Sequence, residues 1–305
     1  MNILITGGAG FIGTKLIERL LPKHKILVID NFIHQVHGTN PKVVADVEYI
    51  IGDICDKEVL NRCINFNPEI IFHLAAETGT AQSMYEISRC INTNVTGTAA
   101  LLENLKHFKK LTKIILASTR AVYGEISNVS ETTNNLQPVS IYGLSKLFQE
   151  KLIKSFSNVS YVIFRYQNVY GPGQSLDNPH TGIISMFFKK LQNNEDIEIY
   201  DNGELTRDFI YIDDAVDATL LGMNPNIKNK IYNVGTGVET KLLDIAEIIK
   251  AQLSSKGKIN IVSKHRDGDI LRAKGCINII KAELSWSPEI DIETGIKNLI
   301  QPTYE

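Results

Sequence analysis

Residues 1–13 read MNILITGGAGFIG, a short apolar run that leads into a glycine-rich turn. The run at 3–5 has no polar face, which is typical of a strand covered on both sides in a parallel sheet. Gly7, Gly10 and Gly13 follow at three-residue spacing. Glycines at this spacing allow a tight turn, a close approach of a diphosphate to the backbone, and a helix packed against the strand. The stretch therefore predicts a strand, a turn and a helix that together bind a dinucleotide.

A second apolar run, at 26–29, ends in Asp30, about twenty residues after the glycine turn. A carboxylate at the end of this strand accepts hydrogen bonds from ribose hydroxyls and repels a 2′-phosphate, which favours NAD over NADP. The alternative is that Asp30 only caps a loop. Asp53, after the third apolar run, also has two interpretations. It accepts a hydrogen bond from the adenine amino group, or it is a plain loop aspartate. His73, at the end of the fourth run, is interpreted as a hydrogen-bonded core residue.

The composition excludes some classes of function. The chain has 305 residues and a formal net charge of −2, which suits one large domain or two of ordinary size and indicates no nucleic-acid or membrane partner. No leader pattern and no run long enough to span a bilayer is present, so we expect a cytoplasmic protein. The cysteines lack metal-type pairing, and we expect them to be reduced and no metal to be bound. They are Cys55, Cys63, Cys90 and Cys276.

Apolar runs alternate with helical patterns from residue 1 to about 166, which predicts an α/β protein with a Rossmann-type doubly wound parallel sheet. The expected strands are 2–6, 25–30, 47–51, 69–74, 113–118 and 161–165, and the expected helices are about 11–21, 56–66, 92–107 and 139–156. Regularity falls afterwards, although an apolar run at 231–234 is expected to return to the sheet. The sequence thus predicts an NAD-binding domain over 1–167 plus about 209–235. A smaller, interleaved α/β domain over 168–208 and 236–305 is expected to bind the substrate.

A catalytic group is predicted from one strand end and one helix. Thr119 follows the apolar run at 113–118, and Tyr142 and Lys146, four residues apart, share a face of the helix expected over 139–156. A free tyrosine titrates near pH 10, so it acts as a base at neutral pH only where positive charge stabilises the phenolate. Lys146 and a nicotinamidium supply that charge. The pattern predicts that Tyr142 deprotonates a sugar hydroxyl held by Thr119 while a hydride passes to NAD⁺.

The motifs of the whole chain resemble those of the extended short-chain dehydrogenase/reductase family, in particular its NAD-dependent nucleotide-sugar epimerase/dehydratase group. They occur in the family's order at 6–13, 28–31, 52–54, 73–76, 118–124 and 142–146. The resemblance implies that Thr119, Tyr142 and Lys146 are catalytic, and it also implies a homodimer built through helices near 92–107 and 139–156. The residues it places around NAD are Gly7, Gly10, Phe11, Ile12, Gly13, Asp30, Asn31, Asp53, Ile54, Ala75, Ala76, Thr78, Asn94, Tyr142 and Lys146.

The same resemblance implies a nucleotide diphosphate sugar as substrate. Asn168 would donate to a phosphate, Arg207 would bind the diphosphate, and Arg266 would add a second guanidinium, in keeping with the planar donors of arginine. For Arg207 and Arg266 the alternative is surface ion pairing. The full set of expected substrate contacts is Thr80, Thr119, Arg120, Asn168, Gln174, Asn178, Arg207 and Arg266.

Dehydratases of this group carry Asp-Glu after the catalytic threonine, whereas this chain has Arg120-Ala121, so we predict no 4,6-dehydratase activity. Segments 76–85, 118–125 and 167–182 resemble the dTDP-L-rhamnose 4-epimerases, which interconvert dTDP-L-rhamnose and dTDP-6-deoxy-L-talose. The expected reaction is C4 epimerisation of a dTDP-6-deoxyhexose. The alternatives are a 4-epimerase of UDP-glucose, UDP-galactose or their N-acetyl forms, a nucleotide-sugar 4-keto reductase or decarboxylase, and, from another class, a non-catalytic dinucleotide sensor.

Overall fold

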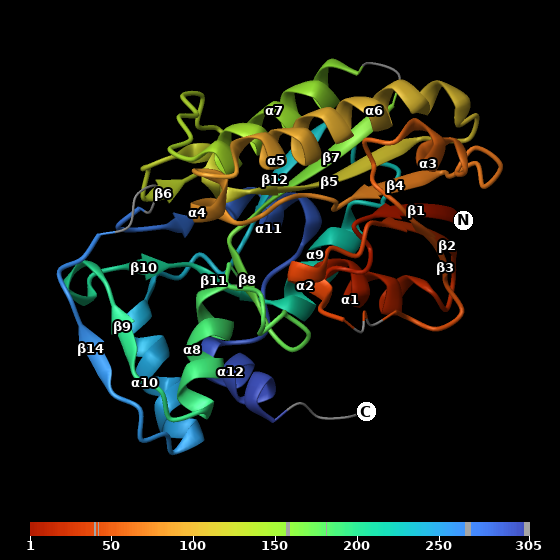
Figure 1. The fold of residues 1–305 in the computed structure, drawn as a ribbon. Coiled ribbons are helices and arrows are strands. Elements are labelled where there is room, and N and C mark those ends of the chain that lie inside the picture. The colour runs from red at the N-terminus through yellow and green to blue at the C-terminus, as the bar shows by residue number, and fades with distance from the viewer. Residues whose placement is uncertain (40, 42, 157–158, 181, 266–269, 302–305) are drawn as a thin grey trace.

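A seven-stranded parallel sheet forms the centre of the computed structural model, which describes residues 1–39, 41, 43–156, 159–180, 182–265 and 270–301. Its strand order is β12-β7-β5-β4-β1-β2-β3 (Figure 1). The bounds are β1 Asn2–Thr6, β2 Lys25–Asp30, β3 Glu48–Ile51, β4 Ile70–His73, β5 Lys113–Thr119, β7 Ser160–Tyr166 and β12 Lys230–Val234. The six strands expected from apolar runs are confirmed, and so is the return of the run at 231–234, as β12 beside β7. The fold is the predicted Rossmann-type doubly wound sheet.

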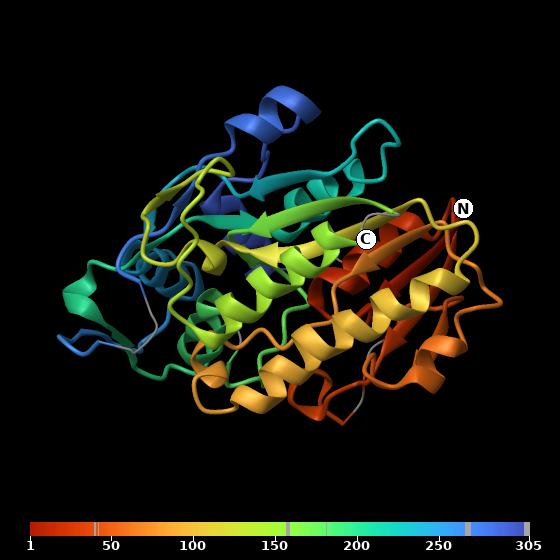
Figure 2. The same cartoon turned by 90° about the horizontal axis from the view of Figure 1, so that it is seen from above.

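Helices cover both faces of this sheet. One face carries α3 (Lys57–Asn61), α5 (Ile87–Ile91), η1 (Asn92–Thr96), α6 (Gly97–Asn104), η2 (Leu105–His107) and α7 (Ile141–Ser155), and Figure 2 shows the helices of this layer crossing the strands side by side. The other face carries α1 (Phe11–Leu20), α9 (Ile212–Leu221) and α11 (Asn278–Leu284). Successive side chains of β1 point to opposite faces of the sheet, so this strand contributes to the core on both sides. Ile3 and Ile5 belong to the same apolar cluster as Leu16 of α1, and Leu4 belongs to the same cluster as Leu101 of α6.

Two helices differ from their predicted bounds. The helix expected over 56–66 ends at Asn61, and the chain continues in turns up to Asn67, whose positive φ of 49° is incompatible with a regular helix. The helix expected over 92–107 starts earlier, with α5 at Ile87, and passes through the π-helical turn η1. A π-turn inserts one residue into the helical repeat and therefore rotates the side chains that follow it.

Most of the remaining elements of the second half of the chain lie at the lower left of Figure 1, beside the carboxyl edge of the sheet. Among the described residues, four small two-stranded sheets pair β8 with β11, β9 with β14, β10 with β13 and β6 with β15. Their bounds are β6 Asn128–Val129, β8 Asn168–Tyr170, β9 Ile197–Ile199, β10 Thr206–Arg207, β11 Phe209–Tyr211, β13 Thr240–Lys241, β14 Ile259–Ile261 and β15 Lys274–Gly275. The helices are α2 His34–His37, α4 Thr80–Ser83, η3 Arg120–Tyr123, α8 Ile183–Gln192, η4 Asp201–Gly203, α10 Leu242–Leu253 and α12 Ile292–Ile300. The boundary between an NAD-binding and a substrate-binding domain stays a prediction.

Within the described residues, every helix is too short or too polar to cross a bilayer. The four cysteines are all free of disulfide bonds.

Candidate active site

A cavity of about 600 Å³ lies at the carboxyl ends of the central strands, where β1 and β4 are neighbours and the sheet order reverses. Most residues predicted from the sequence line it. On the cofactor side these are Gly7, Gly10, Phe11, Ile12, Gly13, Asp30, Asn31, Asp53, Ile54, Ala75, Ala76, Thr78, Tyr142 and Lys146. On the substrate side they are Thr80, Thr119, Asn168, Gln174, Asn178 and Arg207. The fold thus brings both predicted sets to one opening.

Two glycines of the turn have no room for a side chain. Gly7 has a φ of +70°, and a Cβ there would come within 2.6 Å of the backbone nitrogen of Ala75. A Cβ on Gly13 would lie 2.6 Å from the Cα of Gly8. The helix α1 begins after Gly10 without a side-chain cap, so its first N–H groups are available to an anion in the cavity. These features fit a diphosphate held against the backbone.

Asp30 supports this turn from the end of β2. Its Oδ2 accepts the backbone N–H of Ala9 at 2.9 Å, and its Oδ1 accepts the N–H of Phe32 at 2.9 Å. The imidazole of His37 lies 3.5 Å from Oδ1. Asp30 therefore holds a loop, as the alternative interpretation had it, and it also lines the cavity. Its bond to the ribose hydroxyls stays a prediction. Asp53 likewise accepts the N–H of Cys55 at 2.8 Å while lining the same space.

Thr119, Tyr142 and Lys146 all line the cavity. Thr119 is the last residue of β5, and its side chain is hydrogen-bonded to that of Tyr142. The helix α7 that carries Tyr142 and Lys146 is capped by Ser140, whose hydroxyl accepts the N–H of Gly143 at 3.1 Å. The cap fixes the start of the helix, so one turn separates the phenol from the ammonium group.

Burial shifts the proton affinities of this pair in opposite directions. Desolvation raises the pKa of Tyr142 to about 12, and the hydrogen bond from Thr119 opposes that rise. Desolvation lowers the pKa of Lys146 to about 7, while the charge of Glu150, one turn further along α7, raises it. The phenol therefore keeps its proton at neutral pH unless further positive charge comes close. A cationic nicotinamide ring would supply such charge.

Two predicted site residues lie elsewhere. Asn94, expected beside NAD, is fully buried in η1 and bonds the backbone of Glu77 through both ends of its amide, at 2.8 and 3.0 Å. Arg120, expected at the substrate, is outside the cavity lining and donates to the carbonyl oxygens of Gly124 and Ile126 at 3.3 and 2.9 Å. Both side chains stabilise loops through these hydrogen bonds. The spacing of residues in the sequence did not indicate that the two side chains point away from the cavity. Arg266 lies outside the described residues.

His73 is the core residue that the sequence indicated. Its Nδ1 is 2.7 Å from the hydroxyl of Thr6 and its Nε2 is 2.9 Å from that of Thr98. Burial lowers its pKa to about 3. It is a neutral hydrogen-bonding link between strands and helix.

Comparison with known proteins identifies the family of the chain. Residues 3–235 match the model of the NAD dependent epimerase/dehydratase family. The chain belongs to the NAD-dependent epimerase/dehydratase family. Members of the family are enzymes that use NAD, and NAD is the cofactor of this epimerase/dehydratase.

Relatives of this epimerase/dehydratase span almost its whole length. It is 35% identical to a dTDP-L-rhamnose 4-epimerase of Burkholderia thailandensis, over 98% of this chain and 93% of the relative. It is 37% identical to a putative UDP-glucose 4-epimerase of Methanocaldococcus jannaschii, over 98% and 97%. Among solved structures, the UDP-glucose 4-epimerase of Thermotoga maritima with UDP-glucose superposes with a TM-score of 0.90 at 31% identity, over 98% and 97% of the two chains.

The cavity of this epimerase/dehydratase also includes residues that the sequence patterns did not indicate. Ile33, Val36 and His37 from α2 and the residues before it line its outer part, together with Gln167 and Met186. The helix α2 has only four residues and buries none of them, so it has no apolar period. The sequence could have indicated that α2 lines the cavity only through its position shortly after Asp30, because that places it at the carboxyl edge of the sheet.

Proposed function

We propose that the enzyme is a nucleotide-sugar 4-epimerase that oxidises C4 of its substrate transiently, lets the 4-ketosugar rotate, and reduces it on the opposite face. The observation that carries the proposal is that Thr119, Tyr142 and Lys146 line the same cavity as the glycine turn, with the side chains of Thr119 and Tyr142 hydrogen-bonded. Among the described lining residues the only carboxylates are Asp30 and Asp53, which belong to the β2 and β3 ends. An elimination needs an acid and a base near the sugar in addition to Tyr142, and none of the described lining residues supplies a carboxylate beside Thr119.

The roles of the side chains follow from their positions. Thr119 orients the C4 hydroxyl and Tyr142 takes its proton, which returns in the second half of the reaction. Lys146 lies one turn below and stabilises the phenolate by its charge. When bound, NAD supplies the hydride acceptor and donor. Because the hydride returns to the same sugar, there is no net redox change, and the cofactor need not leave.

Two contacts are proposed for the diphosphate. Arg207 and Asn168 both line the cavity. Their backbones are held side by side, because the N–H of Asn168 donates to the carbonyl oxygen of Asp208, the residue after Arg207, at 2.9 Å. Arg207 is 8% exposed, and its Nη1 donates to the carbonyl of Thr206 at 2.6 Å. A buried guanidinium that lines a cavity suits a phosphate better than an exposed ion pair does.

For the sugar we propose a dTDP-6-deoxyhexose, dTDP-L-rhamnose or dTDP-6-deoxy-L-talose. This is supported by the identity to the Burkholderia relative and by the segments 76–85, 118–125 and 167–182. The second candidate is a UDP-hexose, which the Methanocaldococcus relative favours at a similar identity.

Proton NMR tests the reaction and the sugar together. The purified protein, without added cofactor, is incubated separately with dTDP-L-rhamnose, UDP-glucose and UDP-N-acetylglucosamine, and the H4 signal is followed. A new H4 signal of the epimer with dTDP-L-rhamnose alone is the expected result, and one with a UDP-sugar alone replaces the proposed substrate. Stoichiometric consumption of NADH with a 4-ketosugar and no epimer from any substrate would instead identify a reductase. No turnover with intact NAD binding would favour a dinucleotide sensor.

We also propose that two copies of the chain form a homodimer through the layer of α5 and α7. Leu144 and Phe148 of α7 and Ile87 of α5 are 49%, 48% and 48% exposed. The two helices pack against each other, and Figure 2 shows their layer on the outside of the molecule. Exposed apolar side chains gathered on one face are typical of an interface between subunits.

A further inference from the structure

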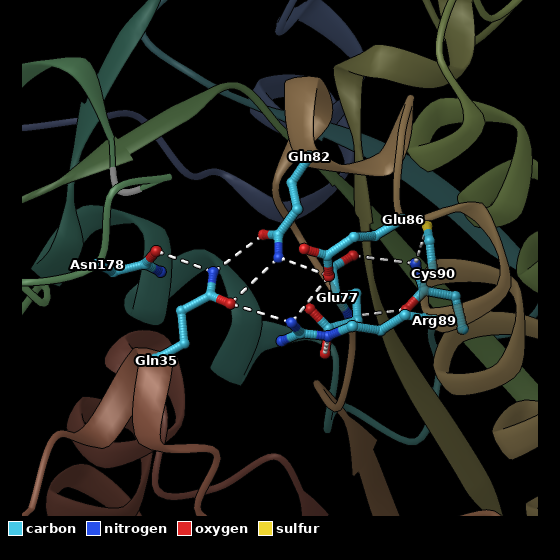
Figure 3. Close-up of polar contacts among 8 residues, drawn as sticks. Gln35, Glu77, Gln82, Glu86, Arg89, Cys90 and Asn178 are labelled. Carbon is cyan, nitrogen blue, oxygen red and sulfur yellow. Dashed lines mark hydrogen bonds and ion pairs between the residues drawn. The ribbon is translucent and has the colours of Figure 1, made fainter.

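Gln35 of α2 and Gln82 of α4 form a reciprocal amide pair at the edge of the cavity. Nε2 of Gln35 donates to Oε1 of Gln82 at 2.9 Å, and Nε2 of Gln82 donates to Oε1 of Gln35 at 3.1 Å. Figure 3 shows Gln35 rising from α2 with Asn178 on one side and Gln82 and Arg89 on the other. The pair joins the segment after β2, which lines the cofactor side, to the segment after β4.

Charged neighbours fix which end of each amide is the donor. Glu86 accepts from Nε2 of Gln82 at 3.0 Å, and Arg89 donates to Oε1 of Gln35 at 3.1 Å. A carboxylate only accepts and a guanidinium only donates, so neither amide is free to turn over without losing a charge-assisted bond. Arg89 is itself held by Glu77 at 2.9 Å.

The second N–H of Gln35 reaches across the cavity edge. It donates to Oδ1 of Asn178 at 3.1 Å, and the same oxygen accepts the backbone N–H of His180 at 2.9 Å. His180 also lies 3.1 Å from the hydroxyl of Tyr85 in α4's neighbouring turn. Gln35 thus uses both donors and both acceptors, and one of these bonds joins the cofactor side to the segment that carries the proposed substrate contacts Gln174 and Asn178.

The other end of the network reaches the catalytic helix. Asn94 bonds the backbone of Glu77 and also donates to the hydroxyl of Ser145 at 2.8 Å. Ser145 directly precedes Lys146 and donates to the carbonyl of Tyr142 at 2.8 Å. Continuous hydrogen bonds therefore connect α7, the segment after β4, α2 and the segment at 174–180.

We propose that Gln35 is a positioning residue that ties α2 to Asn178 and so holds the cavity closed around NAD. Ile33, Val36 and His37 of the α2 segment line the cavity and move with Gln35, so breaking the bond to Asn178 frees one wall and speeds the escape of the dinucleotide. The proposal rests on NAD occupying this cavity and not on which sugar reacts, and its test does not depend on the outcome of the epimerisation assay.

The test times the release of NADH. Protein loaded with NADH is mixed with a large excess of NAD⁺, and the loss of bound-nucleotide fluorescence is followed. Gln35→Glu has the same shape and still accepts from Arg89, but it places an oxygen against Oε1 of Gln82 and Oδ1 of Asn178. We expect it to release NADH on the order of tenfold faster or more, because it removes both bonds that Nε2 of Gln35 donates. Asn178→Ala removes only the far end of the second bond and should release NADH faster than the wild type, though no faster than Gln35→Glu.

A matched variant separates positioning from general damage. His34→Ala alters an exposed residue of α2 outside the cavity lining and should release NADH at the wild-type rate. The double variant Gln35→Glu/Asn178→Ala should release NADH no faster than the quicker single variant, because both break one connection. Wild-type release by Gln35→Glu, or multiplied effects in the double variant, would overturn the proposal, whatever the unfolding temperatures.

Discussion

Glu150 and Arg165 form a bidentate ion pair in the core, with 2.9 Å between Oε1 and Nε and 2.7 Å between Oε2 and Nη2. Their side chains are 0% and 2% exposed. The hydroxyl of Ser118 donates to Oε1 at 2.6 Å. Glu150 follows Lys146 by one turn of α7, and Ser118 precedes Thr119, so this pair fixes the catalytic helix to the catalytic strand from behind.

Glu150→Gln is expected to lower the free energy of unfolding by roughly 3–5 kcal/mol, because it leaves the buried guanidinium of Arg165 without a counter-charge. Urea unfolding measures the change. Lys230→Met is the control, since it breaks an ion pair of similar length, 2.8 Å, whose side chains are 46% and 38% exposed; its cost should stay below about 1 kcal/mol. If the two variants lost equal free energies of unfolding, burial would not be the reason for the cost of Glu150→Gln.

Tyr142→Phe is expected to keep NAD bound and to lower turnover by roughly 10²–10⁴-fold, the usual contribution of a positioned acid–base group. Initial rates of epimer formation and the amount of NAD that copurifies measure the two effects. Tyr123→Phe is the control: it also loses a buried hydroxyl, which donates to Asn233 at 2.7 Å, but Tyr123 is outside the cavity lining. A Tyr142 variant with undiminished turnover would remove Tyr142 as the base.

Substitutions in the glycine turn should separate stability from cofactor binding. A Cβ on Gly13 meets Gly8 atoms at 2.6 Å, so Gly13→Ala should destabilise the fold by on the order of 1–3 kcal/mol. A Cβ on Gly10 meets only the carbonyl oxygen of Gly7, at 3.3 Å, and Gly10 lines the cavity. Gly10→Ala should therefore unfold at nearly the wild-type temperature and bind NAD more weakly. Calorimetric titration with NAD and thermal unfolding distinguish the two, and an unchanged affinity in Gly10→Ala would argue against a diphosphate at this turn.

The strands of the sheet were predictable because a strand buried on both faces is a continuous apolar run bounded by polar residues. The cavity residues were predictable for a related reason: the motifs follow those runs, and the carboxyl ends of parallel strands meet at one edge. Gly7, Asp30 and Thr119 are examples, each at or just after a strand end.

Other parts of the site lacked such a signal. The direction of Asn94 depends on the π-turn η1, which shifts the helical repeat and leaves no trace in apolar spacing. Arg120 turns toward Gly124 and Ile126 because η3 begins directly after Thr119. The amide pair of Gln35 and Gln82 joins residues 47 positions apart on short polar helices, and only their packing brings them together.

His73 should make the stability depend on pH in the acidic range. Burial lowers its pKa to about 3 from an ordinary 6.5, so between these values the unfolded chain binds a proton that the folded chain does not. Stability is then complete above pH 6.5 and falls as the pH drops toward 3, by up to about 1.4 kcal/mol per pH unit from this group. His73→Asn removes the titrating ring. The free energy of unfolding of this variant, measured in urea at pH 4.5 to 6, should therefore depend less steeply on pH than that of the wild type. The difference in slope should be up to about 1.4 kcal/mol per pH unit. An identical slope for the two proteins would contradict the pKa assigned to His73.

Phe148→Asp should convert the dimer proposed for the α5–α7 layer into a monomer. Phe148 is 48% exposed and follows Leu144 by one helical turn, so a carboxylate at this position would be buried without a partner between two copies of the chain. Light scattering after gel filtration gives the mass of each species. Val238→Asp is the control, because Val238 is 60% exposed and belongs to the segment before β13, away from α7 in the sequence and outside the proposed interface. A dimer that persists in Phe148→Asp, or that is lost equally in Val238→Asp, would place the subunit contact on another face.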